Sequence, residues 1–407
     1  MVPNGWKLGV ISDLADTVMG YAFKSADFTK AGIPLLRMGN LYQNTLSFDR
    51  NPIYLPKSFK KNYERFLVKP NDLVMSMTGT MGKRDYGFTV KIPTDAPYSL
   101  LNQRVIKFVP KHESSSGFLL NLLRSEIILS RLYAIPGGTK QANLSAKQIQ
   151  ELPAPIPPLP EQRKIAKILS TWDKAISTTE RLIDNSKQQK KALMQQLLTG
   201  KKRLLDDSGK PFEGEWEEVK LNSVAEIKRG AGSQYITYVE KADEGIRLIR
   251  ISDFLGDSLK YIKHTEDINR FILQKDDLLI AGTGATAGIV FEVPDKLSGL
   301  AFSYNAPRIR VHKTTNKKFI YYYLKSEIIL NQQLSLFTGN AQPFLDTKAI
   351  GGFRIKLPDL KEQQKIASVL TITDKEIELL EQQLADLKQE KKALMQQLLT
   401  GKHRVKI

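Results

Sequence analysis

Several short polar stretches of the chain carry side chains that can read DNA. Arginine and lysine donate to guanine in the major groove, and asparagine and glutamine form paired hydrogen bonds with adenine. Hydroxyls and lysines also contact phosphate oxygens. The candidates are Arg37, Thr78, Lys83, Arg84, Tyr86, Thr139, Lys140, Gln141, Asn143, Lys228, Arg229, Arg250, Thr283, Asn340 and Gln342. A single residue of this kind is most often part of a solvated loop, but the whole set favours DNA as the ligand.

The sequence shows no motif typical of catalysis or metal binding. It contains no cysteine, which excludes thiol catalysis and cysteine-ligated metal sites. The four histidines show no spacing typical of a metal site or a catalytic base, and they are His112, His264, His312 and His403. We therefore assign no catalytic, cofactor-binding or metal-binding residue. A site assembled from distant segments is the alternative that the sequence leaves open.

Two stretches resemble cofactor or base-binding motifs and fall short of them. Residues 282–288 (GTGATAG) follow a strand-like run but lack the Gly-Lys-Ser/Thr of a P-loop, and their counterpart at 77–82 lacks the first glycine. We expect a tight turn that approaches a ligand or a DNA backbone. Residues 51–54 (NPIY) resemble the Asn-Pro-Pro-Tyr of amino-methyltransferases, but without its second proline, so we interpret them as a loop turn.

Composition narrows the class of protein. The chain has 407 residues, 61 lysines and arginines, 43 aspartates and glutamates, and a net charge of +18. Such an excess favours polyanionic partners, nucleic acid before an acidic membrane surface. No apolar run approaches the length of a membrane span, and the start, MVPNGWKLGV, shows no signal-peptide core. We expect a cytoplasmic globular protein with no membrane association.

A stretch of about fifty residues occurs twice and organises the chain. Residues 155–204 return as residues 356–405, and Glu362 lies 201 positions after Glu161. Each copy predicts one helix that begins after a proline-rich or Asp-capped start and ends before Gly200 or Gly401. A helix of that length, about 39 residues, extends roughly 58 Å.

The apolar residues of both copies step by three and four, which is the pattern of a coiled coil. The alternative is a helix that packs only on its own domain, but the length argues against it. We expect the two helices to pair antiparallel through Ile165, Leu169, Trp172, Ile176, Ile183, Leu193, Leu197, Ile366, Leu370, Ile377, Leu380, Leu384, Leu387, Leu394 and Leu398. Thr179, Ser186 and Lys190 weaken the first seam, and we expect them to face other subunits.

The repeat extends over the rest of the chain. LRSEIIL at 123–129 returns as LKSEIIL at 324–330, Trp6 pairs with Trp216, and Asn102 pairs with Asn305. The predicted strands are 33–37, 72–78, 103–109, 246–251, 277–281 and 308–312, and residues 118–132 and 319–334 have helical spacing. The predicted fold is α+β: two homologous mixed domains at 1–154 and 206–355, with long helices at 155–205 and 356–407, related by a pseudo-twofold.

The motifs at the start of the long helices are similar to those of a known family. PPLPEQRKI at 157–165 with a second copy 201 residues on, the start VPNGW, and helix ends reading LLTGK resemble the specificity subunits of type I restriction–modification enzymes. The second copy departs slightly, with PDLKEQ at 358–363. The resemblance covers essentially the whole chain.

This resemblance implies two target-recognition domains, each reading one half of a bipartite DNA site. It also implies two methyltransferase subunits that methylate adenine N6 with S-adenosylmethionine, and two restriction subunits that use ATP and Mg²⁺ to translocate and cleave DNA. This chain would bind double-stranded DNA and none of those cofactors. The competing hypotheses are a standalone DNA-binding regulator, a coiled-coil adaptor for RNA or membrane, and a methyltransferase in its own right.

Overall fold

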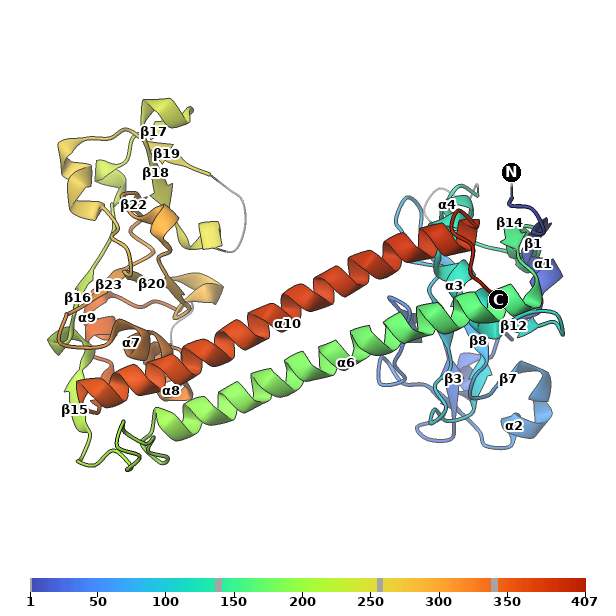
Figure 1. The fold of residues 1–407 in the computed structure, drawn as a ribbon, viewed down its shortest axis with the longest axis horizontal. Coiled ribbons are helices and arrows are strands. Elements are labelled where there is room, and N and C mark those ends of the chain that lie inside the picture. Colours follow the sequence, from blue (N-terminus) through green and yellow to red (C-terminus); the bar gives the residue numbers. More distant parts are fainter. Residues whose placement is uncertain (1, 136–140, 255–258, 338–342) are drawn as a thin grey trace. The chain divides into compact units, whose positions relative to one another are not determined.

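A computed structural model describes residues 2–135, 141–254, 259–337 and 343–407. The chain divides into two compact units, Met1–Glu180 with Gln382–Ile407 (unit 1) and Arg181–Glu381 (unit 2). Each unit therefore contains one part of each long helix. Figure 1 shows the elements of both units.

Unit 1 is built on two four-stranded sheets. The first has the order β10-β8-β12-β2 with every pair antiparallel, and its strands are Thr89–Lys91, Leu73–Ser76, Val105–Pro110 and Ala15–Met19. The second has the order β6-β3-β11-β7, and its strands are Tyr54–Leu55, Ile33–Leu36, Ser99–Leu101 and Leu67–Val68. The pair of β3 and β11 is parallel, with Leu36 opposite Leu101.

Shorter elements complete unit 1. The strand pairs are β1 (Lys7–Val10) with β14 (Pro153–Ile156), β9 (Thr78–Thr80) with β13 (Gln141–Asn143), and β4 (Leu41–Tyr42) with β5 (Thr45–Leu46). The helices are α1 (Ile11–Leu14), α2 (Phe59–Asn62), α3 (Ser116–Arg124), α4 (Glu126–Tyr133) and α5 (Ala146–Gln150).

Unit 2 repeats this plan. Its first sheet has the order β16-β23-β20-β21, with strands Ala225–Lys228, Arg308–Val311, Leu278–Ile280 and Val290–Glu292. Its second has the order β17-β19-β18-β22, with strands Tyr238–Val239, Tyr261–Ile262, Ile246–Ile249 and Ala301–Phe302, and β18 pairs with β22 in parallel. The remaining elements are β15 (Glu217–Lys220) paired with β24 (Arg354–Leu357), and helices α7 (Lys317–Leu324), α8 (Glu327–Phe337) and α9 (Thr347–Gly351).

All six predicted strands exist, with ends that differ by up to two residues from the prediction, but two helix predictions are wrong in one respect. Residues 118–132 and 319–334 each form two helices instead of one. The break falls at Ser125 and at its counterpart Ser326, where each hydroxyl donates to a carbonyl oxygen three residues earlier, on Leu122 and Tyr323. Local serine bonds of this kind compete with the helical pattern, and apolar periodicity does not register them.

The predicted pairing of Asn102 with Asn305 is also wrong, by two residues. The backbone N–H of Asn102 donates to the carbonyl of Leu36, and in unit 2 Ser303 makes the same bond to Ile249. Asn305 instead accepts from Gly282, as Arg104 accepts from Met77. Asn305 is therefore the counterpart of Arg104, two residues after Asn102.

The two repeated stretches form the long helices α6 (Leu159–Leu197) and α10 (Leu360–Thr400). The side chain of Asp359 accepts from the backbone of Glu362 at 3.0 Å, which confirms the predicted cap. Gly200 and Gly401 take the left-handed conformation, with φ of 72° and 71°; Gly401 directly follows α10, and Gly200 lies three residues after the end of α6. This conformation is the one that glycine adopts without strain.

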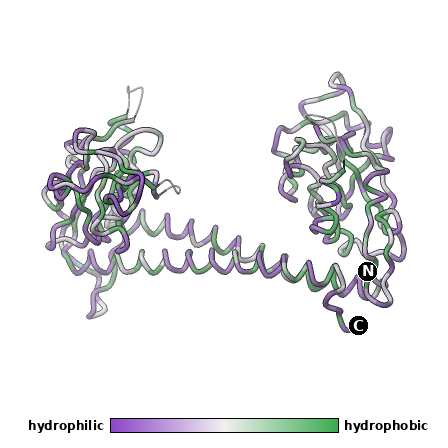
Figure 2. The backbone as a smooth tube through the Cα atoms, turned by 90° about the horizontal axis from the view of Figure 1, so that it is seen from above, coloured by the Kyte–Doolittle hydropathy of each residue, from purple (hydrophilic) through white to green (hydrophobic). Residues whose placement is uncertain are grey.

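The two helices pair antiparallel within each unit. In unit 1, Lys391 bonds Asp173 at 2.5 Å and Lys388 bonds Glu180 at 2.8 Å. In unit 2, the counterparts 201 positions away form the same pairs with the helices exchanged: Lys190 with Asp374, and Lys187 with Glu381 at 2.7 Å. The predicted antiparallel pairing is therefore confirmed, and apolar and polar residues alternate along both helices (Figure 2).

The ends of the long helices belong to the cores of the units. Ile165, Leu169 and Leu398 lie in the core of unit 1, and Leu197, Ile366 and Leu370 lie in that of unit 2. Along the helices, Ile183 and Ile377 are also buried, whereas the other predicted packing residues are partly buried: Trp172, Ile176, Leu193, Leu380, Leu384, Leu387 and Leu394.

The expectation that Thr179, Ser186 and Lys190 face other subunits is wrong for this conformation. Thr179 and Ser186 are buried, and the Lys190 side chain is only 16% exposed. The Thr179 hydroxyl donates to the carbonyl of Ala175 at 3.0 Å, which satisfies it inside its own helix. The ammonium of Lys190 is compensated by Asp374, so a polar seam residue need not face solvent or a partner.

The Glu-Gln of each repeat holds a helix start in place. Glu161 is fully buried and accepts from Trp6 at 2.9 Å and from Arg404 at 2.5 and 2.9 Å. In unit 2 the fully buried Glu362 accepts from Trp216 at 3.2 Å and from Arg203 at 2.7 Å through both oxygens. We call each of these groups a glutamate clamp. The motif is therefore a structural anchor.

Candidate nucleic-acid interface

Unit 2 contains an open hollow of about 610 Å³ that brings two predicted DNA-binding residues together. Arg250 comes from the segment after β18, and Thr283 comes from the glycine-rich turn after β20. Tyr238, Ser252, Tyr304 and Asn305 also line it. Hydroxyls, an amide and a guanidinium thus face one concave surface, which is the set of donors and acceptors that base edges require.

The glycine-rich stretch forms the tight turn that the sequence predicts. Gly284 and Gly288 have positive φ angles of 76° and 90°. The backbone of Gly282 donates to Asn305 at 2.9 Å, and Leu345 donates to Gly282 at 2.8 Å. These bonds fix the turn against two neighbouring segments and leave Thr283 and Thr286 on the hollow.

Arg250 is held by a carboxylate. Its backbone N–H donates to Asp253 at 2.6 Å, and its Nε lies 3.4 Å from the same oxygen. In unit 1 the backbone of Arg37 donates to Asn40 at 2.9 Å in the same way. The two arginines therefore occupy equivalent positions, but Arg37 has a neutral amide where Arg250 has a charged partner.

Arg229 lies between two exposed aromatic rings. It follows β16 directly, and its guanidinium carbon is 4.3 Å from the centre of the Tyr304 ring and 5.1 Å from that of Phe344. It also bonds the Tyr304 hydroxyl. Lys228, the last residue of β16, is half-buried opposite Arg308.

Unit 1 presents a corresponding surface with different side chains. Gln103 and Arg104 are exposed in the turn before β12, where unit 2 has Tyr304 and Asn305. The nearby pair of β9 and β13 exposes Gln141 and Asn143. Thr78, by contrast, is buried, and its hydroxyl donates to the side chain of Asn143 at 3.1 Å.

The loop with Lys83, Arg84 and Tyr86 differs from its prediction. Tyr86 is only 3% exposed and packs in the core of unit 1 against Tyr133, and burial raises its pKa. Tyr86 therefore cannot reach a base in this conformation, because the ring fills the space beside α4. Arg84 donates to both oxygens of Glu126 at 3.0 and 3.1 Å, while Lys83 is exposed.

Four predicted contacts, Thr139, Lys140, Asn340 and Gln342, lie outside the described residues. Sequence reasoning also missed several exposed residues on these two surfaces: Gln103, Arg104, Tyr304, Asn305 and Phe344. The prediction assigned residues 103–109 to a strand, whereas β12 begins only at Val105. A polar turn at the same place in both halves, NQR and SYN, is the signal that could have found them.

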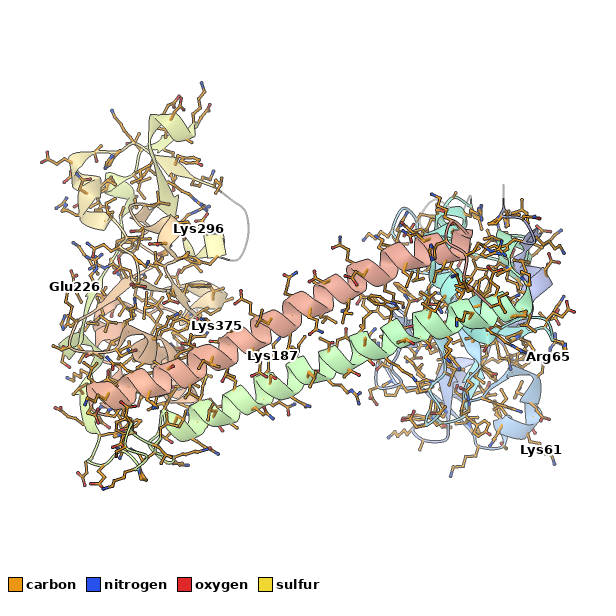
Figure 3. All side chains as sticks on the ribbon, in the orientation of Figure 1. Lys61, Arg65, Lys187, Glu226, Lys296 and Lys375 are labelled. Carbon is orange, nitrogen blue, oxygen red and sulfur yellow. The ribbon has the colours of Figure 1, made fainter. Side chains whose placement is uncertain are left out.

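Unit 1 also carries a basic surface around α2. Lys61 and Arg65, on and just after α2, lie at the surface (Figure 3). Lys60 lies 4.2 Å above the ring of Tyr98. Lysine and arginine on an exposed helix supply charge for phosphate contacts without carrying sequence information.

Among the described residues, no cluster of three His, Asp or Glu side chains could hold a metal ion. The helices in the described ranges are also too polar or too short to cross a membrane. The observations therefore centre on two polar surfaces, one in each unit.

The chain matches the family described as the type I restriction modification DNA specificity domain over residues 3–186 and 213–389. It is 29% identical over 288 residues, 66% of each protein, to the MjaVIII specificity subunit of Methanocaldococcus jannaschii. It is 26% identical to the putative MjaX specificity subunit of the same organism, over 100% of this chain and 95% of that protein. The crystal structure of the S subunit from M. genitalium matches 98% of both chains with a TM-score of 0.59 at 16% identity, which shows a shared fold.

The duplicated mixed fold and its paired helices define a two-domain DNA-specificity protein. The chain belongs to the family of specificity subunits of type I restriction–modification systems, the non-catalytic component of those enzymes.

Proposed function

We propose that each unit reads one half of a bipartite, asymmetric DNA site. The observation that carries this proposal is the difference between the two surfaces at equivalent positions. Where unit 1 has Met19, unit 2 has Arg229, and where unit 1 has Gln103, unit 2 has Tyr304. Two copies of one scaffold with different side chains at their reading surfaces suit two different half-sites.

The exposed and half-buried polar residues of these surfaces are the proposed contacts. In unit 1 they are Arg37, Lys83, Arg84, Gln103, Arg104, Gln141 and Asn143, and in unit 2 they are Lys228, Arg229, Arg250, Thr283, Tyr304 and Asn305. Thr139, Lys140, Asn340 and Gln342 stay in the proposal on sequence grounds. The recognition domains are taken as 1–154 and 206–355.

The remaining parts of the proposal concern the assembly. The paired helices would dock two methyltransferase subunits, which methylate adenine N6 with S-adenosylmethionine. Two restriction subunits would use ATP and Mg²⁺ to translocate and cleave DNA in the cytoplasm. Burial of the carboxylates of Glu161 and Glu362 in clamps supports a purely structural role for the helix motif in this chain.

A map of N6-methyladenine in the host genome, with and without this gene, tests the proposal. One bipartite motif should vanish on deletion, and exchange of residues 1–150 with those of a relative should change only one half of it. Methylation that survives deletion unchanged, or an exchange that alters both halves, would refute the assignment. The rival hypothesis of a standalone regulator predicts tight, site-specific binding by the purified chain alone.

The paired helices would also set the gap between the half-sites. One additional helical turn in each long helix adds about 5.4 Å. At about 3.4 Å per base pair, the nonspecific spacer should grow by one or two base pairs. A gap that stays the same in the methylation motif of such an insertion variant would contradict the role of the helices as a ruler.

A further inference from the structure

Arg229 differs from two other arginines of unit 2, Arg250 and Arg308, in how its charge is compensated. Among the described residues, Arg229 contacts no carboxylate, whereas Arg250 contacts Asp253 and Arg308 contacts Glu226. The contacts of Arg229 are with two aromatic rings and one hydroxyl. The guanidinium therefore keeps most of its hydrogen-bond donors available for a ligand.

The position of Arg229 is fixed by its backbone. The next residue, Gly230, lies so close to β22 and the turn after it that a Cβ atom would come within 2.3 Å of the carbonyl oxygens of Phe302 and Ser303. The backbone of Ala231 also donates to Phe302 at 2.8 Å. Arg229 thus projects from a segment clamped against the same turn that carries Tyr304.

Two exposed aromatic rings confine the Arg229 side chain. Their centres lie 4.3 and 5.1 Å from the guanidinium carbon, and Tyr304 and Phe344 are 43% and 45% exposed, so the half-buried guanidinium lies near the surface. A phosphate needs only a positive charge nearby, for which a lysine suffices, whereas bidentate bonding to the O6 and N7 atoms of guanine needs a planar donor held in one orientation. The two ring contacts and the bond to the Tyr304 hydroxyl hold the guanidinium in place before DNA binds.

We infer that Arg229, held by Tyr304 and Phe344, reads a guanine in the half-site of unit 2. This inference rests on the proposed function and adds to it the base that one residue selects. The scaffold of unit 1 is equivalent at this point, because Gly20 there approaches the carbonyl of Asn102 as Gly230 approaches that of Ser303, the counterpart of Asn102. Met19 replaces the arginine, so this contact to guanine is confined to one half-site.

The test is the N6-methyladenine map of hosts that carry variants of the full chain with its natural partner subunits. Exchange of residues 1–150 first identifies which half of the motif belongs to unit 2. In Arg229→Ala, the preference for guanine at one position of that half should fall by about 5- to 150-fold, the range that corresponds to about 1–3 kcal/mol for a bidentate contact. The other half of the motif should not change.

Arg270→Ala is the matched control. Arg270 also lies over a tyrosine in unit 2, 5.2 Å from the ring centre of Tyr235, but it is neutralised by Asp267 at 2.5 Å. Its loss removes the same charge and should leave the motif as it is. Arg229→Lys keeps the charge but cannot form the bidentate pair, so it should retain methylation with a relaxed base preference.

Three results would overturn the inference. The first is a motif with no G·C pair in the half that belongs to unit 2. The second is a uniform fall of methylation at all sites in Arg229→Lys and Arg229→Ala with the motif unchanged, which indicates a phosphate contact. The third is no change at all in either variant. These results can be told apart from a failure of the proposed function itself. In that case deletion of the gene would leave every methylation motif in place.

Discussion

Replacement of Glu362 by glutamine should loosen the start of α10 strongly and locally. The carboxylate is fully buried and is the acceptor for both nitrogens of the Arg203 fork and for Trp216. Glutamine keeps the shape but removes the charge, which leaves the guanidinium of Arg203 without its counter-ion. Loss of one partner of a buried pair costs about 3–5 kcal/mol.

Native-state hydrogen exchange measures this effect where it arises. At about 1.4 kcal/mol per factor of ten, amides in the first turns of α10, residues 360–370, should exchange about 150- to 4,000-fold faster. The equivalent turns of α6, residues 159–169, are an internal control in the same molecule, because they depend on Glu161 and Arg404 instead. Glu161→Gln should produce the converse pattern.

The double variant Glu362→Gln with Arg203→Gln separates charge from packing. It removes both charges, so it should recover part of the stability that the single variant loses. Two results would refute the view that each clamp stabilises its own unit. One is a rise of less than tenfold in the amide exchange rates at the start of α10 in Glu362→Gln, and the other is an equal rise at both helix starts.

Three further variants test other parts of the structure. Lys190→Asp should destabilise unit 2 by about 1–3 kcal/mol in urea unfolding, a value between those for exposed and buried ion pairs. Adding Asp374→Lys should restore most of the lost stability, and no recovery would argue against the ion pair. Gly401→Ala should lower Tm more than Gly200→Ala. A Cβ at position 401 would come within 2.3 Å of Pro3, whereas a Cβ at position 200 would have its nearest neighbour, on Trp216, at 3.5 Å; equal changes in Tm would contradict this. Burial raises the pKa of Tyr133 to about 12, so its contribution to stability is present below about pH 10 and is lost as pH rises to about 12. Tyr133→Phe should therefore reduce the alkaline loss of stability in unit 1 over that window, and urea midpoints at pH 9 and pH 11.5 that fall as much as in the parent would disprove it.

The elements that the sequence predicted well are those defined by spacing alone. A gapless repeat over more than forty residues determines helix length, helix ends and the antiparallel partner. The ion pairs between the two long helices agree with this, because each has a counterpart 201 positions away. The strands followed from apolar runs bounded by polar turns. Both signals are local or periodic, and neither depends on knowledge of the tertiary fold.

The predictions that failed depended on what a side chain meets in space. Tyr86 lies in a polar stretch typical of a surface loop, but its ring is buried beside α4. The hydroxyl of Thr78 donates to the side chain of Asn143 and is therefore not available to DNA. Lys190 looked unsuited to a helix seam, yet Asp374 lies across from it. The stacking of Arg229 on Tyr304 joins residues 75 positions apart, and no local pattern in the sequence announces it.

The reciprocal ion pairs allow each half of the chain to pair with a copy of itself. Each repeat supplies the lysine for one pair and the aspartate for its mirror pair, as Lys190 with Asp374 and Lys391 with Asp173 show. An interface of this kind is isologous, since the same patch meets itself. A half-length chain would carry both complementary patches, so two identical copies would associate as a homodimer and present the same reading surface twice. Such a dimer would select a palindrome, and tandem fusion followed by divergence of the two surfaces would turn that palindrome into an asymmetric target.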